Sequence, residues 1–192
     1  IDKTIVSTED SEIASISLDL GAEVLSRPNW LASDCSLSID VIKNVVENVS
    51  EDNQLVPDTI ILLQPTSPLR THLHIDRALE IYSKGTSDSL VSVVSVPHSF
   101  QPQSLMVLRK GYLSPYFPTD KTPSLIESSD CLYARNGAAI YIFSYECLMK
   151  KNSLYGDAVI PFEMEPHESI DINEQWDLDL CELIMRAKDS KE

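Results

Sequence analysis

One stretch constrains this chain more than any other: Ile60 to Arg70, an apolar run that passes into a loop stiffened by two prolines. Its four apolar residues, Ile60–Leu63, predict a short strand buried on both faces, as in a parallel sheet. Pro65 and Pro68 exclude a helix or a further strand directly after it. Open α/β sheets bind ligands beyond the carboxyl ends of such strands, which is where Gln64 lies. The stretch therefore indicates a ligand-binding loop, although an ordinary strand-to-helix connection accounts for these residues alone about as well.

Strand-like and helix-like segments alternate along the rest of the chain. Strands are expected at 4–7, 23–25, 89–96, 138–143 and 158–163, and helices at 10–20, 38–49, 72–83, 145–151 and 174–187. Lys110-Gly111 predicts the turn of a hairpin formed by 105–108 and 112–113. A long loop is expected over Ser114–Asp130, and loops of that length are usually binding or interface elements. The alternation predicts an α/β fold, a three-layer αβα arrangement with a mostly parallel sheet, from which the hairpin is the one departure.

Two local details of packing and capping are also predicted. Ile13, Ile16 and Leu20 keep a helical spacing, so one face of the first helix is expected to pack on a sheet. Ser36 or Ser38 is expected to cap the second helix, because serine oxygen readily accepts a hydrogen bond from a free N–H of the first turn.

The composition is that of one acidic folded domain. A chain of 192 residues with 43% hydrophobic residues is long enough for an α/β domain with a full core. The net charge of −15 argues against binding to nucleic acid or to an anionic membrane, both of which need basic surfaces. No apolar run approaches the roughly 20 residues of a membrane span. The four cysteines are scattered, which predicts reduced thiols in a cytoplasmic protein.

The loop sequence carries a family resemblance. Leu62 to Thr71 (LLQPTSPLRT), followed by His74-Ile75-Asp76, closely resembles the acylneuraminate (CMP-sialic-acid-type) cytidylyltransferases, above all the bacterial ones. The resemblance implies a single nucleotide-diphospho-sugar transferase-like domain over 1–192, with an insertion at about 97–133 that helps to form a homodimer. It also implies transfer of CMP from CTP to the anomeric hydroxyl of a nine-carbon acid sugar, N-acylneuraminate or a related nonulosonic acid, with release of pyrophosphate. The implied cofactor is Mg²⁺.

The metal would be held near the C-terminus. Asp171 and Asn173 place two oxygen-bearing side chains on the same side of an extended segment, which suits magnesium. From the residues alone, a capping box of Asp171 with Glu174 is favoured by about two to one. The resemblance reverses this preference, because SIDIN followed by Asp177 resembles the closing Asp-Ile-Asp motif whose two aspartates hold the metal in the family. Asn173 takes the second aspartate's place without its charge, so weaker metal binding is expected.

The resemblance also assigns the substrate contacts. Arg27 and Ser38 would contact the nucleotide, although a surface arginine and a helix cap explain the two residues more simply. Gln64 would hydrogen-bond the acceptor sugar. Arg135, which precedes Asn136-Gly137, would face the sugar's carboxylate or the phosphates, a role suited to its planar fork of donors.

Other residues are expected to be structural. Arg70 closes the loop motif, and a role in capping the loop or pairing with an acid such as Asp76 is at least as well supported as a catalytic one. Tyr155-Gly156-Asp157 also resembles relatives, but no chemistry is assigned to it. The four histidines are dispersed and form no triad or metal pattern, so we interpret them as structural.

One family motif has no counterpart in this sequence: the basic, glycine-rich loop after the first strand, which cradles the triphosphate. The chain starts without Met, almost inside a strand, so we expect it to be the C-terminal part of a longer enzyme, with very low activity alone. The competing hypothesis is a non-catalytic fragment or remnant that binds nucleotide or pairs with an intact subunit, and Asn173 favours it. A third is a nucleotidyltransferase for a hexose or an eight-carbon sugar.

Overall fold

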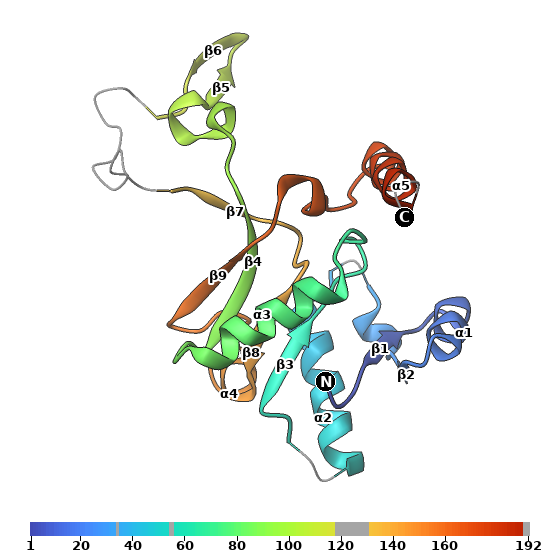
Figure 1. Cartoon of the computed structure of the whole chain (residues 1–192). Helices are drawn as coiled ribbons and strands as arrows, with labels where there is room; N and C mark the ends of the chain where they lie inside the picture. Colours follow the sequence, from blue (N-terminus) through green and yellow to red (C-terminus); the bar gives the residue numbers. More distant parts are fainter. Residues whose placement is uncertain (34, 54–55, 118–130, 190–192) are drawn as a thin grey trace. The chain divides into compact units, whose positions relative to one another are not determined.

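The computed structural model describes residues 1–33, 35–53, 56–117 and 131–189. Figure 1 shows the chain coloured along its sequence. Its contacts divide the chain into two compact units. Unit 1 consists of Ile1–Ile61, Ser87–Ser89 and Ile142–Val159, and unit 2 consists of Leu62–Thr86, Leu90–Tyr141 and Ile160–Glu192. Helices alternate with strands in both units, which agrees with the predicted α/β character.

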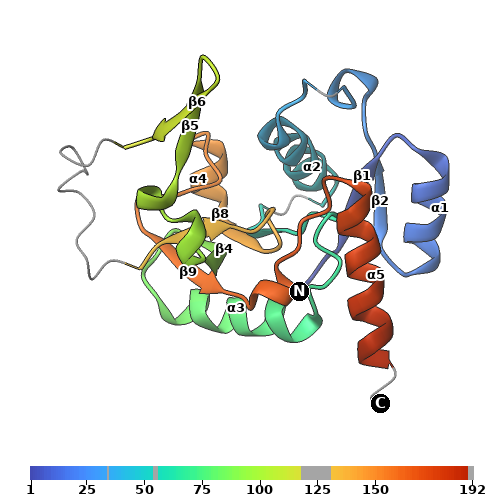
Figure 2. The same ribbon diagram turned by 90° about the horizontal axis from the view of Figure 1, so that it is seen from above.

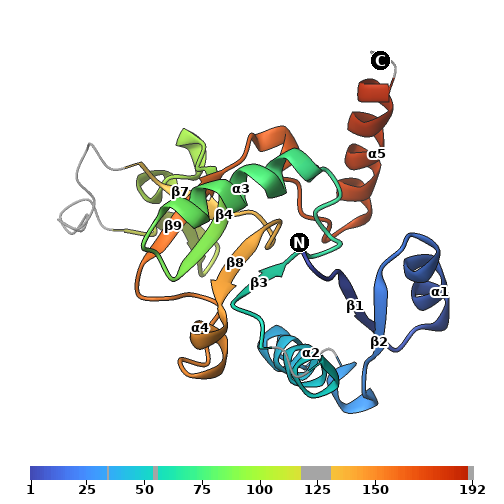
Figure 3. The ribbon, with the colours of Figure 1, turned by 60° about the horizontal axis from the view of Figure 1, so that its bottom comes forward.

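The elements follow the predicted order closely. Unit 1 contains β1 (Ile5–Thr8), α1 (Ser11–Asp19), β2 (Glu23–Ser26), a 3-10 turn (Asn29–Leu31), α2 (Ser38–Asn53), α4 (Tyr145–Met149) and most of β3 (Thr59–Leu62) and β8 (Tyr141–Ser144). Unit 2 contains α3 (His72–Lys84), β5 (Met106–Arg109), β6 (Tyr112–Pro115), β7 (Tyr133–Arg135), α5 (Gln175–Asp189), most of β4 (Ser89–Ser95) and β9 (Val159–Glu163), and 3-10 turns at His98–Phe100, Pro102–Ser104 and Pro166–Glu168. In unit 2, α3 lies along β4 and β9 (Figure 3).

The first strand–helix–strand unit forms as predicted. β1 and β2 are parallel, with Ile5 opposite Glu23 and Thr8 opposite Ser26, and α1 lies beside them (Figure 2). Asp10 caps α1, because its carboxylate accepts hydrogen bonds from the N–H groups at the second and third helical positions, at 2.8 and 2.9 Å. The cap and the βαβ pattern are therefore encoded locally.

Three predictions about burial and capping are wrong. The apolar face of α1 packs poorly, since Ile13 and Ile16 are half exposed, because a two-stranded sheet covers only part of that face. Neither Ser36 nor Ser38 caps α2, whose first N–H bonds go to the carbonyl of Leu37, while Ser36 Oγ bonds to Trp30 O. The side chains of β3 are only partly buried, because β3 ends the strand order β3-β8-β4-β7.

The five-stranded sheet contains an antiparallel pair. β4 pairs with β7 antiparallel and also pairs with β9. The hairpin of β5 and β6 forms where it was predicted, with Met106 opposite Pro115 and Arg109 opposite Tyr112. Its turn residues, Lys110 and Gly111, both have positive φ, of 51° and 85°, which gives a turn that matches the twist of the two strands. The loop predicted over Ser114–Asp130 lies outside the described residues from position 118 onward.

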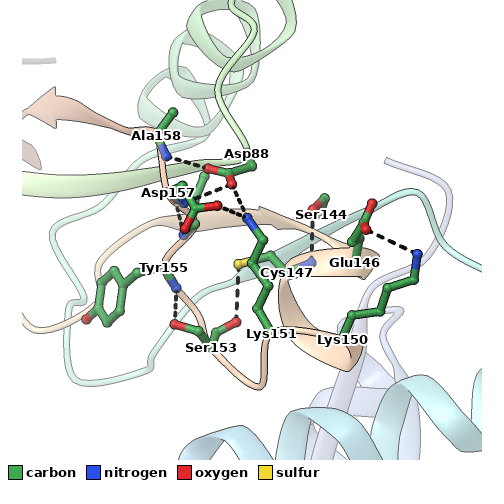
Figure 4. Close-up of polar contacts among 12 residues, drawn as sticks. Asp88, Ser144, Glu146, Cys147, Lys150, Lys151, Ser153, Tyr155, Asp157 and Ala158 are labelled. Carbon is green, nitrogen blue, oxygen red and sulfur yellow. Dashed lines mark hydrogen bonds and ion pairs between the residues drawn. The ribbon is translucent and has the colours of Figure 1, made fainter.

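Asp88, just before β4, anchors the segment that follows α4 in unit 1 (Figure 4). Its carboxylate accepts hydrogen bonds from the N–H groups of Asp157 and Ala158, both at 2.9 Å, and from Lys151 Nζ at 2.7 Å. The hydrogen bond from Lys151 and then the two N–H groups hold the pKa of Asp88 well below its usual range. A Cβ on Gly156 would lie 1.8 Å from Asp88 Oδ1. These five residues, which we call the Asp88 junction, give the unassigned Tyr-Gly-Asp motif a structural role.

The predictions about thiols and membrane spans were also tested. All four cysteines are free, and burial raises the pKa of the Cys147 and Cys181 thiols. Within the ranges that the structure describes, no helix combines the length and the apolar character that a membrane span requires.

Candidate active site

The QPTSPLR loop (Gln64–Arg70) is a rigid turn structure in unit 2. Gln64 N–H donates to Ala138 O at 3.3 Å, and two successive turns follow, from Ser67 N–H to Gln64 O and from Arg70 N–H to Ser67 O, both at 3.4 Å. Arg70 Nη1 then donates to Gln64 O at 3.1 Å and to Ala139 O at 2.7 Å. Burial lowers the pKa of Arg70 from its ordinary value. Arg70 therefore braces the loop, which is the structural role predicted for it.

A second turn lies against this loop. β7 ends at Arg135, which pairs with Val93 of β4, and the next residue, Asn136, is only 3% exposed. Asn136 Nδ2 donates to Ser169 Oγ at 3.0 Å, which ties the turn to the segment leading to Asp171. Gly137 has a φ of +69°, in the left-handed region that favours glycine. Because residue 137 is a glycine, the backbone of this turn is not covered by a side chain at that position.

Asp171 occupies the space that the missing side chain leaves. A Cβ built on Gly137 would lie 2.2 Å from Asp171 Cγ, so the carboxylate packs directly on the glycine. The following residue donates its N–H to Thr66 O at 2.8 Å, which joins the Asp171 segment to the QPTSPLR loop. Asn173 Nδ2 donates to Asp171 Oδ2 at 3.1 Å. We call Gly137, Asp171 and Asn173 the Asp171 junction. Gln64, Arg135, Asp171 and Asn173 all belong to unit 2.

Asp171 does not cap the last helix, contrary to the reading that the residues alone favoured. The N–H groups of Asn173 and Glu174, which a cap at Asp171 would take, donate instead to Asp177 Oδ2 at 3.0 and 2.9 Å. Asp177 is buried, and it satisfies these donors from inside α5. The Asp171 carboxylate therefore accepts neither of the two N–H groups at the start of α5. This is the strongest structural argument for a functional role of Asp171.

The Asp171 junction suits a magnesium ion that keeps most of its other ligands. Two adjacent oxygen ligands of octahedral Mg²⁺, each at about 2.1 Å, lie about 3.0 Å apart. The amide of Asn173 lies 3.1 Å from Asp171 Oδ2, so the amide turned by 180° would offer its oxygen at the required spacing. In the described part of the chain, no three His, Cys, Asp or Glu side chains gather into a metal site. The remaining ligands would thus be water and substrate phosphate.

The two predicted nucleotide contacts, Arg27 and Ser38, belong to unit 1. Arg27 is turned toward its own strand pair: Nη2 donates to Ser7 O, and Nε lies 3.7 Å from a carboxylate oxygen of Glu9. Ser38 is exposed at the first residue of α2. Their predicted contacts with nucleotide remain predictions.

Sequence reasoning missed three residues that shape this region. Gly137 was interpreted only as part of a turn, Asp177 only as a motif member, and His74 only as a dispersed histidine. The spacing of Glu174, directly before α5, and Asp177, in its first turn, was a usable signal for the cap. The close approach of Gly137 to Asp171, which are 34 positions apart in sequence, left no local signal.

Comparisons with known proteins give matches along most of the chain. Residues 1–172 match the family model described as cytidylyltransferase. The chain is 32% identical over 190 residues to the CMP-N,N'-diacetyllegionaminic acid synthase of Legionella pneumophila, covering 96% of this chain and 78% of that protein. It is 28% identical over 187 residues to the N-acylneuraminate cytidylyltransferase of Escherichia coli, covering 97% of this chain. The chain spans only 43% of the length of that relative.

A solved structure has the same fold. The CMP:2-keto-3-deoxy-manno-octonic acid synthetase complexed with CTP superposes with a TM-score of 0.64 at 13% sequence identity, covering 98% of this chain and 82% of that one. At such low identity the likeness concerns the fold alone, and it confirms the predicted α/β nucleotidyltransferase-type architecture. The sequence relatives confirm the resemblance that was based on the QPTSPLR loop.

Proposed function

This chain belongs to the cytidylyltransferase family, and we propose that its function is to transfer CMP from CTP to the anomeric hydroxyl of a nine-carbon acid sugar. Two kinds of relative support this substrate class, since their names refer to N-acylneuraminate and to diacetyllegionaminic acid. The observation that carries the proposal is the Asp171 carboxylate, which is fixed on Gly137 beside the QPTSPLR loop and is not used to cap α5.

The reaction needs positioning more than covalent chemistry from the protein. The anomeric hydroxyl loses its proton to solvent as its oxygen forms a bond to the α-phosphorus, the bond from that phosphorus to the bridging oxygen breaks, and pyrophosphate leaves with the electron pair. Asp171 and the amide oxygen of Asn173 would hold Mg²⁺. The metal, when bound, neutralises charge on the phosphates. Gln64 would orient the sugar hydroxyls, and Arg135 would face the sugar carboxylate.

The nucleotide is assigned to unit 1. Arg27 and Ser38 would contact CTP, which requires Arg27 to leave Ser7 O and Glu9 for the ligand. The ion pair of Arg27 with Glu9 is weak competition for a charged ligand, because this contact is long and both side chains are partly exposed. The free cysteines support a reducing compartment, and we assign the protein to the cytoplasm.

A homodimer is the proposed assembly. The β5–β6 hairpin exposes large apolar side chains that a monomer would leave in water: Met106, Leu108, Tyr112 and Leu113. A second copy of the chain is the proposed occupant of this surface. Leu108→Asp with Leu113→Asp is expected to give a monomer by light scattering at a concentration at which the unchanged chain is a dimer. A monomeric unchanged chain would contradict the assignment.

A second candidate function is non-catalytic binding of nucleotide. Asn173 favours it, because an amide gives the metal no charge where the family motif has an aspartate. Such a protein would bind CTP, or pair with an intact subunit, without turnover.

Pyrophosphate release from CTP tests the two candidates. The assay would contain Mg²⁺ and a panel of nine-carbon acid sugars, with an eight-carbon acid sugar and a hexose as further arms. Asp171→Ala is expected to abolish release, whereas Asp179→Ala is expected to leave it unchanged, because Asp179 is exposed on α5 and bonds only to Gln175 in the contacts described. If no sugar supports release while calorimetry detects CTP binding, the transfer proposal is wrong and the binding function is supported.

A further inference from the structure

His74 is the third residue of α3, and both of its ring nitrogens are engaged. Nδ1 accepts a hydrogen bond from the N–H of Thr71 at 3.1 Å, so Nδ1 carries no proton. The ring proton is therefore on Nε2, which faces Glu168 Oε2 at 3.2 Å. Phe162 contacts the ring edge-on, with centroids 6.4 Å apart. The imidazole thus bridges two segments of unit 2.

The bridge is largely removed from solvent. The side chains of His74 and Glu168 are 18% and 19% exposed. Two further nitrogens approach Glu168 Oε1, Lys188 Nζ at 3.8 Å and His167 Nε2 at 4.0 Å. Because these contacts are long, the closest partner of the Glu168 carboxylate is His74.

The two bridged segments are those that form the candidate active site. Thr71 directly follows the QPTSPLR loop, and Glu168 lies three residues before Asp171. A second attachment joins the same two segments, from Ile172 N–H to Thr66 O at 2.8 Å. Asp171 therefore lies between two points at which its segment is fastened to the loop that carries Gln64.

We propose that His74 is a positioning residue for Asp171, acting through Glu168. The Glu168 and Ile172 bonds fasten the segment to the loop side on either side of Asp171, and Ser169 Oγ between them accepts a hydrogen bond from Asn136. Without the Glu168 bond, the segment loses one of these attachments and its direction can change. Loss of the Nε2–Glu168 bond moves the Asp171 carboxylate relative to Asn173 and Gln64. The inference rests on the proposed function of Asp171, and it assigns the role to the Glu168 side of the imidazole rather than to the Thr71 side.

Two substitutions separate the two sides of the ring. His74→Asn keeps an acceptor near the Nδ1 position for Thr71 N–H but cannot reach Glu168. His74→Gln keeps a donor near the Nε2 position for Glu168, and glutamine is also accepted at the third position of a helix. A purely structural histidine predicts that the two variants lose activity in proportion to stability. A positioning histidine predicts that the Asn variant loses much more function than the Gln variant at similar stability.

The test measures Mn²⁺ binding by paramagnetic resonance on the ligand-free chain, together with kcat and KM for pyrophosphate release. His74→Asn is expected to weaken Mn²⁺ binding and lower kcat by about 10-fold, with urea stability similar to that of His74→Gln. His74→Gln is expected to stay within about 3-fold of the unchanged chain. Glu168→Ala should reproduce the Asn variant, and combining Glu168→Ala with His74→Asn should add little further loss.

The possible failures are distinguishable. If Asp171→Ala abolishes Mn²⁺ binding while His74→Asn leaves binding and kcat unchanged, the positioning inference is wrong and the proposed function stands. Equal losses in the Asn and Gln variants would also overturn it. If the unchanged chain binds no Mn²⁺ that depends on Asp171, the metal role of Asp171 fails, and the positioning role fails with it.

Discussion

Two aspartates in this protein are packed on glycines in nearly the same way. A Cβ on Gly156 would lie 1.8 Å from Asp88 Oδ1, and a Cβ on Gly137 would lie 2.2 Å from Asp171 Cγ. In both places the absence of a side chain at a glycine lets a carboxylate from a distant segment pack directly on the backbone. Steric packing alone therefore does not separate the two sites.

Their hydrogen bonding differs sharply. Asp88 accepts two backbone N–H groups and a lysine ammonium, and its pKa lies well below the usual range for a carboxyl because of these bonds. The Asp171 carboxylate accepts a hydrogen bond from the side-chain amide of Asn173. The backbone N–H groups of Asn173 and Glu174 donate to Asp177 instead. A carboxylate whose partners are complete stabilises the fold, and one whose partners are incomplete retains capacity for a cation.

The largest expected effect is a crossover between these two carboxylates. Asp171→Asn is expected to lower pyrophosphate release by at least about 100-fold while changing the free energy of unfolding by less than about 0.5 kcal/mol. Asp88→Asn is expected to do the reverse, because it removes one of the two carboxylate partners of Lys151 and the charge that accepts the N–H groups of Asp157 and Ala158. Urea unfolding and the release assay on both variants measure this. Parallel losses of stability and release in the two variants would contradict the difference in role between Asp88 and Asp171.

Substitutions of Gly137 and Gly156 are expected to have the next largest effects, and they too should differ between the two sites. Gly137→Ala is expected to cost about 1–3 kcal/mol from the clash with Asp171 and the positive φ, and to reduce release by about 10-fold or more by displacing the carboxylate. Gly156→Ala should cost stability alone. Chemical denaturation and kcat at a temperature at which both variants are folded would check this. Unchanged kcat in Gly137→Ala would contradict the role of the carboxylate's position.

A substitution at Asn173 is expected to increase metal affinity rather than to reduce it. Asn173→Asp would restore a second charge beside Asp171, so Mn²⁺ affinity is expected to rise by about 10-fold, since ligand charge sets the affinity for hard cations. Without metal, two like charges about 3 Å apart should lower stability slightly, and metal should reverse this. Resonance titration of Mn²⁺ into the variant, the unchanged chain and Asn173→Ala gives the order. An affinity equal to that of the Ala variant would argue against a metal at this position.

The smallest expected effect is a dependence on pH at the Asp88 junction. The pKa of Asp88 is lowered in the folded state, so its contribution to stability is present above the unfolded value of about 3.9 and is lost as the pH falls below it. The pKa of Lys151 is raised by its bonds to Asp157 and Asp88, so its contribution is present below the unfolded value of about 10.4 and is lost as the pH rises beyond it. Urea unfolding between pH 5 and 2.5 should be less pH-dependent in Asp88→Asn, and an unchanged slope would contradict this.

The parts of the fold that were predicted correctly are those with local causes. The first helix, predicted over 10–20, forms over Ser11–Asp19 with Asp10 as its adjacent cap, and Lys110-Gly111 supplies the two positive φ values of the hairpin turn. The QPTSPLR loop was identified as the organising feature because its prolines and polar end are contiguous. The alternation of strands and helices was sufficient for the α/β class.

The parts that were missed depend on contacts between distant segments. β7 is only three residues long and exists because β4 offers it a partner, so no periodicity could reveal it. The prediction that Asp171 caps the last helix was wrong because its carboxylate packs on Gly137. The N–H groups that it would have accepted donate to Asp177 instead. The partial burial of β3 depends on its place at the end of the strand order, which its apolar sequence does not encode.

The fit of Asp171 on Gly137 has a consequence for how these positions change during evolution. Any residue larger than glycine at 137 collides with the carboxylate, so while Asp171 is kept, position 137 is closed to substitution. A lineage that lost the carboxylate would be released from that constraint and could acquire side chains at 137 without steric cost from position 171, although the positive φ would still favour Asn or Gly. The glycine and the aspartate are thus expected to be inherited and lost as a pair. In related sequences, a bulky residue at the first position should mark a chain that has given up the second.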